Sequence, residues 1–333
     1  RALTDARGLL EHAHHGVPRL GEGDTTDDNA RALLYLSLLP EGARDEGLVR
    51  TYLAFLLHMQ KEDGRFRNGL TLDGRFEDEG EAEDPTGRAV LALAAAQRLP
   101  PPYAGPAREA LLRALPALEG FTSLRGRAYA LLGLLALPKE PFLEAAEALG
   151  EGLLRAFREA EPAWPYPGPL TYANHRPVEA LYAYGLAFRR QEAVALARRA
   201  LAFLKEHYFT PGEEGLFFDP VGNRFMARGR DKPLFDQQPI EAKCALLAHL
   251  RFGERVLAEV AFLWFHGRNR LRAPLVDAFG PMDGLTPHGP NQNRGAEALL
   301  AYLLAWQALV QGVFPQVDEG VALGRVFALG GRP

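Results

Sequence analysis

The sequence predicts an all-α protein built as an (α/α)6 toroid, in which an outer ring of six helices surrounds an inner ring of six. Three observations favour this fold. Segments of helical periodicity alternate between two kinds, one apolar on nearly every side and one amphipathic. No series of alternating strands is present, as a parallel sheet would require. The apolar segments recur at irregular intervals, which indicates a closed ring of helical hairpins rather than a regular solenoid.

The apolar segments are expected to form the inner ring. Each begins with polar residues and then turns strongly apolar, which is typical of a helix that is buried on most sides. They start near Asp27, Asp84, Leu124, Asn174, Asp236 and Asn293.

The amphipathic segments are expected to form the outer ring, with one face toward solvent. They are Arg1–His14, Glu46–Gln60, Ala107–Leu118, Glu140–Glu159, Gln191–His207 and Gly253–His266. Loops that follow inner helices are mostly short, whereas loops that precede them are mostly long. Two long loops, at Arg65–Phe76 and Leu216–Met226, have the pattern of small β-hairpins. Long and varied loops on a rigid scaffold commonly carry function, so we expect the functional site at the N-terminal ends of the inner helices.

Composition limits the possible classes of protein. The 333 residues are 47% apolar and 24% charged, as in a globular protein, and we expect one toroid domain over residues 1–333 with a loosely attached tail at 312–333. A net charge of −4 argues against a nucleic-acid partner, and no apolar run is long enough to span a membrane. No signal peptide is visible, so we expect a cytoplasmic location. Abundant Ala, Leu, Arg and Glu suggest a thermophilic source.

Charged residues inside the apolar segments predict a polar cavity. Helix capping explains Asp27, but it does not explain charges one or two turns further on, which must be paired or face a cavity. Carboxylate, amide and guanidinium groups can bind the hydroxyl groups of a sugar, and aromatic rings can cover its apolar face. The residues expected to bind such a substrate are Asp27, Asp28, Asn29, Arg31, Arg88, Arg127, Trp164, Tyr172, Asn174, Arg176, Glu179, Gln237, Gln238, Glu241, Arg268, Asn269, Asp283, Asn291, Asn293 and Glu297.

Asp84 and Asp236 are the predicted catalytic pair. They open inner helices that lie three steps apart in a ring of six, so we expect them to face each other. An inverting glycoside hydrolase uses two carboxylates about 6.5–9.5 Å apart, one as general acid and one as general base. The other interpretation of these residues is helix capping, for which Asp is well suited.

Two other functions remain open. A sugar epimerase or isomerase on this scaffold would typically use a pair of histidines, and His175 and His288 lie in the expected site region. A glycan-binding accessory domain would need no acid–base pair. We expect no metal or cofactor, since the chain has one cysteine, Cys244, and no nucleotide-binding or zinc-protease motif.

Several segments also resemble a known family. They are TDDNARALL (Thr26–Leu34), EDPTGRAVLAL (Glu83–Leu93), LTYANHRPVEALY (Leu170–Tyr182), FDQQPIEA (Phe235–Ala242), WFHGRNRL (Trp264–Leu271) and DGLTPHGPNQNRGAEALLAYLLA (Asp283–Ala305). The chain resembles bacterial α/α-toroid proteins that are similar to six-hairpin glycosidases and are often encoded near, or fused to, glycosyltransferases and mannoside-processing enzymes. The resemblance covers Asp24 to Ala305 and implies an oligosaccharide or sugar ligand and a glycosyltransferase partner.

Overall fold

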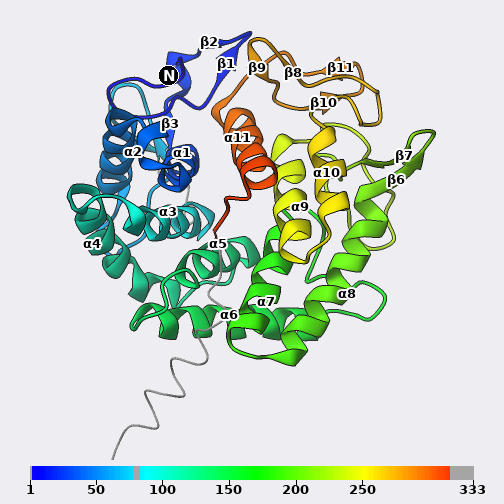
Figure 1. The fold of residues 1–333 in the computed structure, drawn as a ribbon, viewed down its shortest axis with the longest axis horizontal. Coiled ribbons are helices and arrows are strands. Elements are labelled where there is room, and N and C mark those ends of the chain that lie inside the picture. Colours follow the sequence, from blue (N-terminus) through cyan, green and yellow to red (C-terminus); the bar gives the residue numbers. More distant parts are fainter. Residues whose placement is uncertain (1, 78–82, 316–333) are drawn as a thin grey trace, which may run out of the picture.

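Six helices form a closed inner ring in the computed structural model, which describes residues 2–77 and 83–315. They are α1 (Thr26–Leu38), α3 (Glu83–Ala95), α5 (Leu124–Leu134), α7 (His175–Ala187), α9 (Pro239–Arg251) and α11 (Ala296–Gln311). Each contacts the next one along the chain, and α11 contacts α1, so the ring closes (Figure 1). Nearly all residues of α3 and α9 are buried, because an inner helix meets neighbours on most sides. The predicted (α/α)6 toroid is confirmed.

Five described helices form the outer ring. They are α2 (Glu46–Met59), α4 (Pro101–Leu118), α6 (Phe142–Glu159), α8 (Gln191–Tyr208) and α10 (Arg255–Leu263). The start predicted for α4 at Ala107 is wrong. The helix begins at Pro101, because a proline without an N–H group is tolerated in the first turn, where that group would have no partner.

The predicted sixth outer helix, Arg1–His14, is absent from the described residues. The chain there is irregular and ends in a hairpin of β1 (Ala13–His14) and β2 (Val17–Pro18). Its backbone lies directly on α1 and α2, since a Cβ atom at Gly8 would come within 2.9 Å of Asn29 Oδ1 and 2.8 Å of Phe55 Cδ2. The N–H group of Leu9 donates to Asn29 Oδ1 at 3.0 Å, in place of a helical hydrogen bond.

Short antiparallel strands lie in segments that precede inner helices. The remaining ones are β3 (Asp24–Thr25), β4 (Gly69–Leu70), β5 (Phe76–Glu77), β6 (Phe209–Gly212), β7 (Gly215–Phe218), β8 (Val276–Asp277), β9 (Gly280–Pro281), β10 (Leu285–Thr286) and β11 (Gly289–Pro290). The first predicted hairpin is β4–β5, extended to three strands by β3. The second occurs earlier than predicted, as β6–β7. There α8 runs directly into β6, and the chain turns back at Gly215, which has a φ of 96°.

The chain turns back toward the ring after α11. The Arg251 side chain of α9 donates to the carbonyl oxygen of Pro315 at 2.6 Å, and its guanidinium lies 5.4 Å from the centre of the Phe314 ring. Residues 312–315 of the predicted tail therefore contact the inner ring, while 316–333 lie outside the described residues. Among the described helices, none is both long and apolar enough to cross a membrane.

Candidate functional site

A cavity of about 300 Å³ lies among the N-terminal ends of α1, α9 and α11 and the segment before α1. We call it the acidic cavity, because its carboxyl groups outnumber its cations. It is lined by Glu11, His12, Thr25, Asp27, Asp28, Arg31, Asn68, Gln238, Pro239, Asp283, Gly295, Glu297 and Ala298. Its place at the start of inner helices is the end of the ring where the sequence predicted a site.

Local structure explains why carboxylates gather there. Thr25 caps α1 by accepting the N–H group of Asp28 at 3.3 Å, so Asp27 and Asp28 occupy the first turn. Glu297 occupies the first turn of α11. The unpaired N–H groups and the dipole of a helix start favour carboxylates at these positions.

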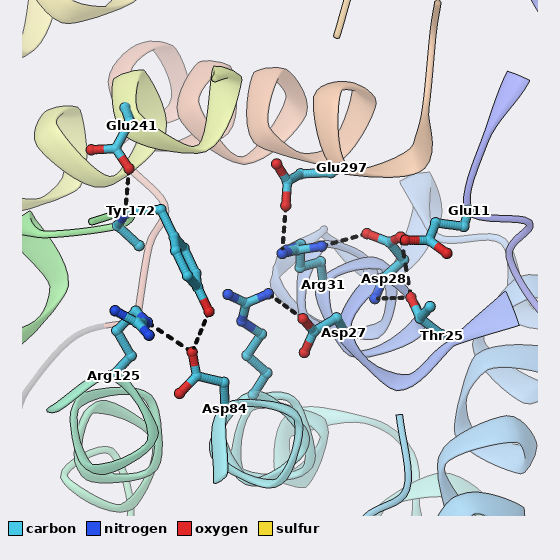
Figure 2. A network of polar contacts seen from close by, with 12 residues as sticks. Glu11, Thr25, Asp27, Asp28, Arg31, Asp84, Arg125, Tyr172, Glu241 and Glu297 are labelled. Atoms are coloured by element: carbon cyan, nitrogen blue, oxygen red, sulfur yellow. Dashed lines mark hydrogen bonds and ion pairs between the residues drawn. The ribbon is translucent and has the colours of Figure 1, made fainter. Parts of the chain in front are cut away.

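Two arginines tie these carboxylates together (Figure 2). Arg31 forms ion pairs with Asp28 and with Glu297, and its Nη2 atom lies 2.9 Å from Glu297 Oε2. Arg88 of α3 donates from Nη1 to Asp27 Oδ2 at 2.7 Å. Both arginine side chains are buried, so their charges fix the orientation of the carboxylates on the cavity wall.

Glu11 has an unusual environment. Burial, together with the neighbouring carboxylate of Asp28, raises the pKa of Glu11 to about 7. Burial also raises the pKa of Asp28, even though Arg31 acts in the opposite direction. Glu11 Oε1 lies 3.5 Å from His12 Nε2, and its side chain is 36% exposed. The cavity therefore contains a carboxyl group that can carry a proton near neutral pH.

Asp84 lies in a neighbouring group of side chains. It accepts hydrogen bonds from Arg125 Nε at 2.8 Å, Tyr172 Oη at 2.7 Å and Ser123 Oγ at 2.8 Å. Burial alone would raise the pKa of Asp84, but Arg125 and the Tyr172 hydroxyl hold it below its usual range. Asp84 is thus an ionised carboxylate, although it does not line the acidic cavity.

Glu241 is buried near the start of α9. Its Oε1 atom accepts the N–H group of Ala173, whereas Oε2 has no hydrogen-bond partner in the part of the chain that the structure describes. Burial raises the pKa of Glu241 to about 7, against the hydrogen bonds from Ala173 and Tyr208. A protonated Glu241 is the form that such a site favours.

Asp236, the other predicted catalytic residue, does not open α9. The helix begins at Pro239, because Gln237 pairs with Leu285 as an isolated bridge and keeps the chain extended. Asp236 is exposed, has a φ of 60°, and its side chain makes no hydrogen bond or ion pair within the described ranges. Neither Asp236 nor Asp84 lines the acidic cavity, and within the described residues no hydrogen bond or ion pair joins the two side chains.

Several residues expected to bind substrate form hydrogen bonds within the fold. The Asn29 side chain accepts the N–H group of Leu9 and donates to the carbonyl group of Thr25. The Asn174 side chain accepts the N–H group of Thr171 and donates to the hydroxyl of Tyr208. The buried amides of Gln237 and Asn269 bond to Asp219, Trp264 and nearby carbonyl groups.

Two more predicted residues, Arg127 and Trp164, lie outside the acidic cavity. Arg127 donates to the carbonyl groups of Phe121 and Gly152 and lines a separate groove between α4, α5 and α6. Trp164 is only 9% exposed, and its indole stacks edge-on against Phe203.

Other residues predicted to bind substrate lie either outside the acidic cavity or on its wall. Arg268 donates to the carbonyl group of Glu214 in the β6–β7 turn. Asn291 and Asn293 organise the loop before α11, where Asn293 also contacts His14. Asp27, Asp28, Arg31, Gln238, Asp283 and Glu297 are the predicted residues that line the acidic cavity.

Sequence reasoning missed Glu11, His12, Thr25 and Asn68 as lining residues. The cause is the erroneous helix over Arg1–His14, which placed Glu11 on an outer surface. Gly8 and Gly16 could have indicated that this segment is not a helix, since glycine disfavours a continuous helix. No three His, Cys, Asp or Glu side chains are grouped as a metal site within residues 2–77 and 83–315.

Comparisons with known proteins place the fold. No family model matches the chain, and no curated protein matches it in sequence. Among solved structures, a D-mannose isomerase is similar, with a TM-score of 0.68, 11% identity, and 93% of each chain covered. A cellobiose 2-epimerase from Spirochaeta thermophila has a TM-score of 0.64 and 15% identity, with 92% of this chain and 89% of that chain covered. A GH76A α-1,6-mannanase from Salegentibacter sp. has a TM-score of 0.59 and 14% identity, with 93% and 94% covered.

Proposed function

We propose that the protein is a carbohydrate-active enzyme that hydrolyses a glycosidic bond of a short oligosaccharide in the acidic cavity. Glu11 would be the general acid and Glu297 the general base. The observation that carries this proposal is that the two carboxyl groups line one cavity with different charged neighbours, Asp28 beside Glu11 and Arg31 paired with Glu297. Such a difference is what separates an acid from a base in a carboxylate pair.

Glu11 suits the acid because its raised pKa keeps a proton available near neutral pH. Glu297 suits the base because one of its oxygens is held by Arg31, while its side chain is 38% exposed and its other oxygen has no bond to a described residue. In the proposed step, Glu297 takes a proton from water as the water oxygen bonds to the anomeric carbon. The bond to the leaving oxygen breaks, and that oxygen takes the proton of Glu11.

The predicted pair of Asp84 and Asp236 stays a prediction that experiment must test. In the present proposal, Asp84 instead positions Arg125 and Tyr172, to which its carboxylate is bonded. The glycosyltransferase partner also stays a prediction.

Sugar isomerisation or epimerisation is the second candidate. Two of the compared structures are a mannose isomerase and a cellobiose 2-epimerase, and His12 lies 3.5 Å from Glu11 in the cavity. His175 and His249 form a pair whose ring centres are 5.8 Å apart. Both side chains are fully buried, and neither lines the cavity. Because this buried histidine pair does not reach a substrate in the cavity, it cannot transfer protons to or from that substrate. Hydrolysis is therefore the favoured function.

Product analysis separates these functions. The purified protein would be incubated with manno- and gluco-oligosaccharides in D2O. Hydrolysis shortens the chain, whereas proton transfer beside a carbonyl group keeps its length and introduces deuterium at carbon. Glu11→Gln and Glu297→Gln should each reduce hydrolysis by roughly 10²-fold or more. The control Glu109→Gln changes an exposed residue of α4 and should retain activity. Binding without any product would favour the accessory-domain function.

A further inference from the structure

Two arginines in the interior of the ring share one carboxylate. Arg176 of α7 and Arg251 of α9 share a single carboxylate, that of Glu179. Arg176 Nη1 lies 2.5 Å from Glu179 Oε2, and Arg251 Nε lies 3.0 Å from Glu179 Oε1. All three side chains are buried, with exposed fractions of 7% or less. One of the two guanidinium charges therefore has no counterion of its own.

Lys243 is a further buried basic group of the inner ring. It is 2% exposed and makes no hydrogen bond or ion pair with any residue that the structure describes. Burial lowers the pKa of Lys243 to about 7, and the guanidinium groups of Arg176, Arg31 and Arg88 act in the same direction. These arginines belong to α7, α1 and α3, whereas Lys243 belongs to α9. These three guanidinium groups therefore lie within electrostatic range of Lys243.

Three arginines of the inner ring also have unused hydrogen-bond donors. Among the residues that the structure describes, the buried Nε groups of Arg31, Arg88 and Arg176 have no acceptor. The Tyr129 ring of α5 lies between two of these guanidinium groups, 4.7 Å from that of Arg88 and 5.6 Å from that of Arg176. A buried donor or charge without a partner is costly, so the region is built for a ligand that accepts several hydrogen bonds and carries negative charge.

We propose that Arg88, Tyr129, Arg176 and Lys243, which we call the inner cation cluster, bind an oxyanion. Phosphate and carboxylate groups share this chemistry, and guanidinium groups are well suited to both. Arg31 lines the acidic cavity, and its guanidinium is near enough to Lys243 to lower the pKa of that lysine. We therefore further propose that one ligand reaches both regions. The substrate class is then an acidic sugar, a step that rests on the proposed function; oxyanion binding itself does not.

Calorimetry and thermal denaturation with inorganic phosphate test the cluster in the intact chain. The wild type should bind phosphate with one saturable site and a raised melting temperature. Lys243→Met should fold without ligand at least as stably as the wild type, because it removes an unpaired buried charge. It should bind phosphate at least 10-fold more weakly. Lys205→Met, which removes an exposed lysine of α8, should bind phosphate normally.

Lys243→Gln provides a second variant if Lys243→Met fails to fold, because it removes the charge but keeps a polar group. Absence of phosphate binding by the wild type, or unchanged binding by the folded Lys243 variant, would overturn the proposal. Mannose 6-phosphate and glucuronate, compared with neutral mannobiose, distinguish a phosphate from a carboxylate ligand. Glu11→Gln should lose hydrolysis but still bind phosphate, so the cation cluster and the proposed reaction can fail separately.

Discussion

The Nη2 atom of Arg31 lies 2.9 Å from Oε2 of Glu297 and connects the first inner helix to the last. These residues are far apart in the chain, and their contact lies where α1 meets α11 to complete the ring (Figure 1). The same contact holds one carboxylate of the acidic cavity in place. One ion pair therefore contributes both to the contact that closes the ring and to the geometry of the cavity.

Arg31→Met should strongly destabilise the protein. Asp28 would remain buried without its cation, and removal of one partner of a buried pair costs about 3–5 kcal/mol. Urea denaturation monitored by circular dichroism measures the change. Arg158→Met, which breaks an exposed pair with Glu192, is the matched control and should hardly alter the midpoint. Equal effects in both variants would contradict a buried role for Arg31.

The rate of the proposed reaction should fall as the pH rises through about 7. The reason is that Glu11, whose pKa is raised to about 7, loses the proton that the leaving group needs. Asp28→Asn removes a negative neighbour, which should lower the pKa of Glu11 and move this alkaline limb to lower pH. Profiles of kcat/KM from pH 5 to 9 measure both effects. An alkaline limb that stays in place in Asp28→Asn would argue against Glu11 as the acid.

Glu241 should make stability depend on pH. Its pKa is raised from 4.5 to about 7 on folding, so the folded state binds more protons than the unfolded state between these values. The free energy of unfolding should consequently fall as pH rises from about 5 to 8, by roughly 3 kcal/mol from this group.

Glu241→Gln should remove this contribution and retain the acceptor for the Ala173 N–H group. The stability difference between variant and wild type should then grow with pH in a series of urea titrations. Glu109→Gln, at an exposed position, should follow the wild type at every pH. A difference that stays constant with pH would show that Glu241 titrates normally.

Asp84→Asn and Asp236→Asn compare the sequence-based catalytic pair with the cavity pair. Asp84→Asn should destabilise the protein by about 1–3 kcal/mol, because Arg125 loses a buried charged partner, with a smaller loss of turnover than in Glu297→Gln. Asp236→Asn should change neither the melting temperature nor turnover, because the side chain is exposed and makes no hydrogen bond or ion pair with a described residue. A loss of about 10²-fold in turnover for both would restore the original pair.

Much of the architecture could be predicted because helix periodicity is local. Apolar residues on nearly every face of Glu83–Ala95 and Pro239–Arg251 require burial on most sides, and the amphipathic pattern of Gln191–Tyr208 requires one wet face. The segment before α1 was mispredicted because its pattern of apolar residues fits an irregular chain that packs along a helix as well as it fits a helix. Its conformation depends on contacts with Asn29 and Phe55, which no local pattern reveals.

The sequence by itself determined the ring of helices and the presence of charges that must be paired or face a cavity, since both follow from burial of side chains along each helix. Only the tertiary structure decided how those charges pair. It placed Arg31 with Glu297, Asp84 with Arg125, and two arginines on Glu179. It also left Asp236 in solvent and Lys243 without a partner among the described residues. The physical reason is that electrostatic energy depends on distance and burial between helices, and helix tilt and offset set both.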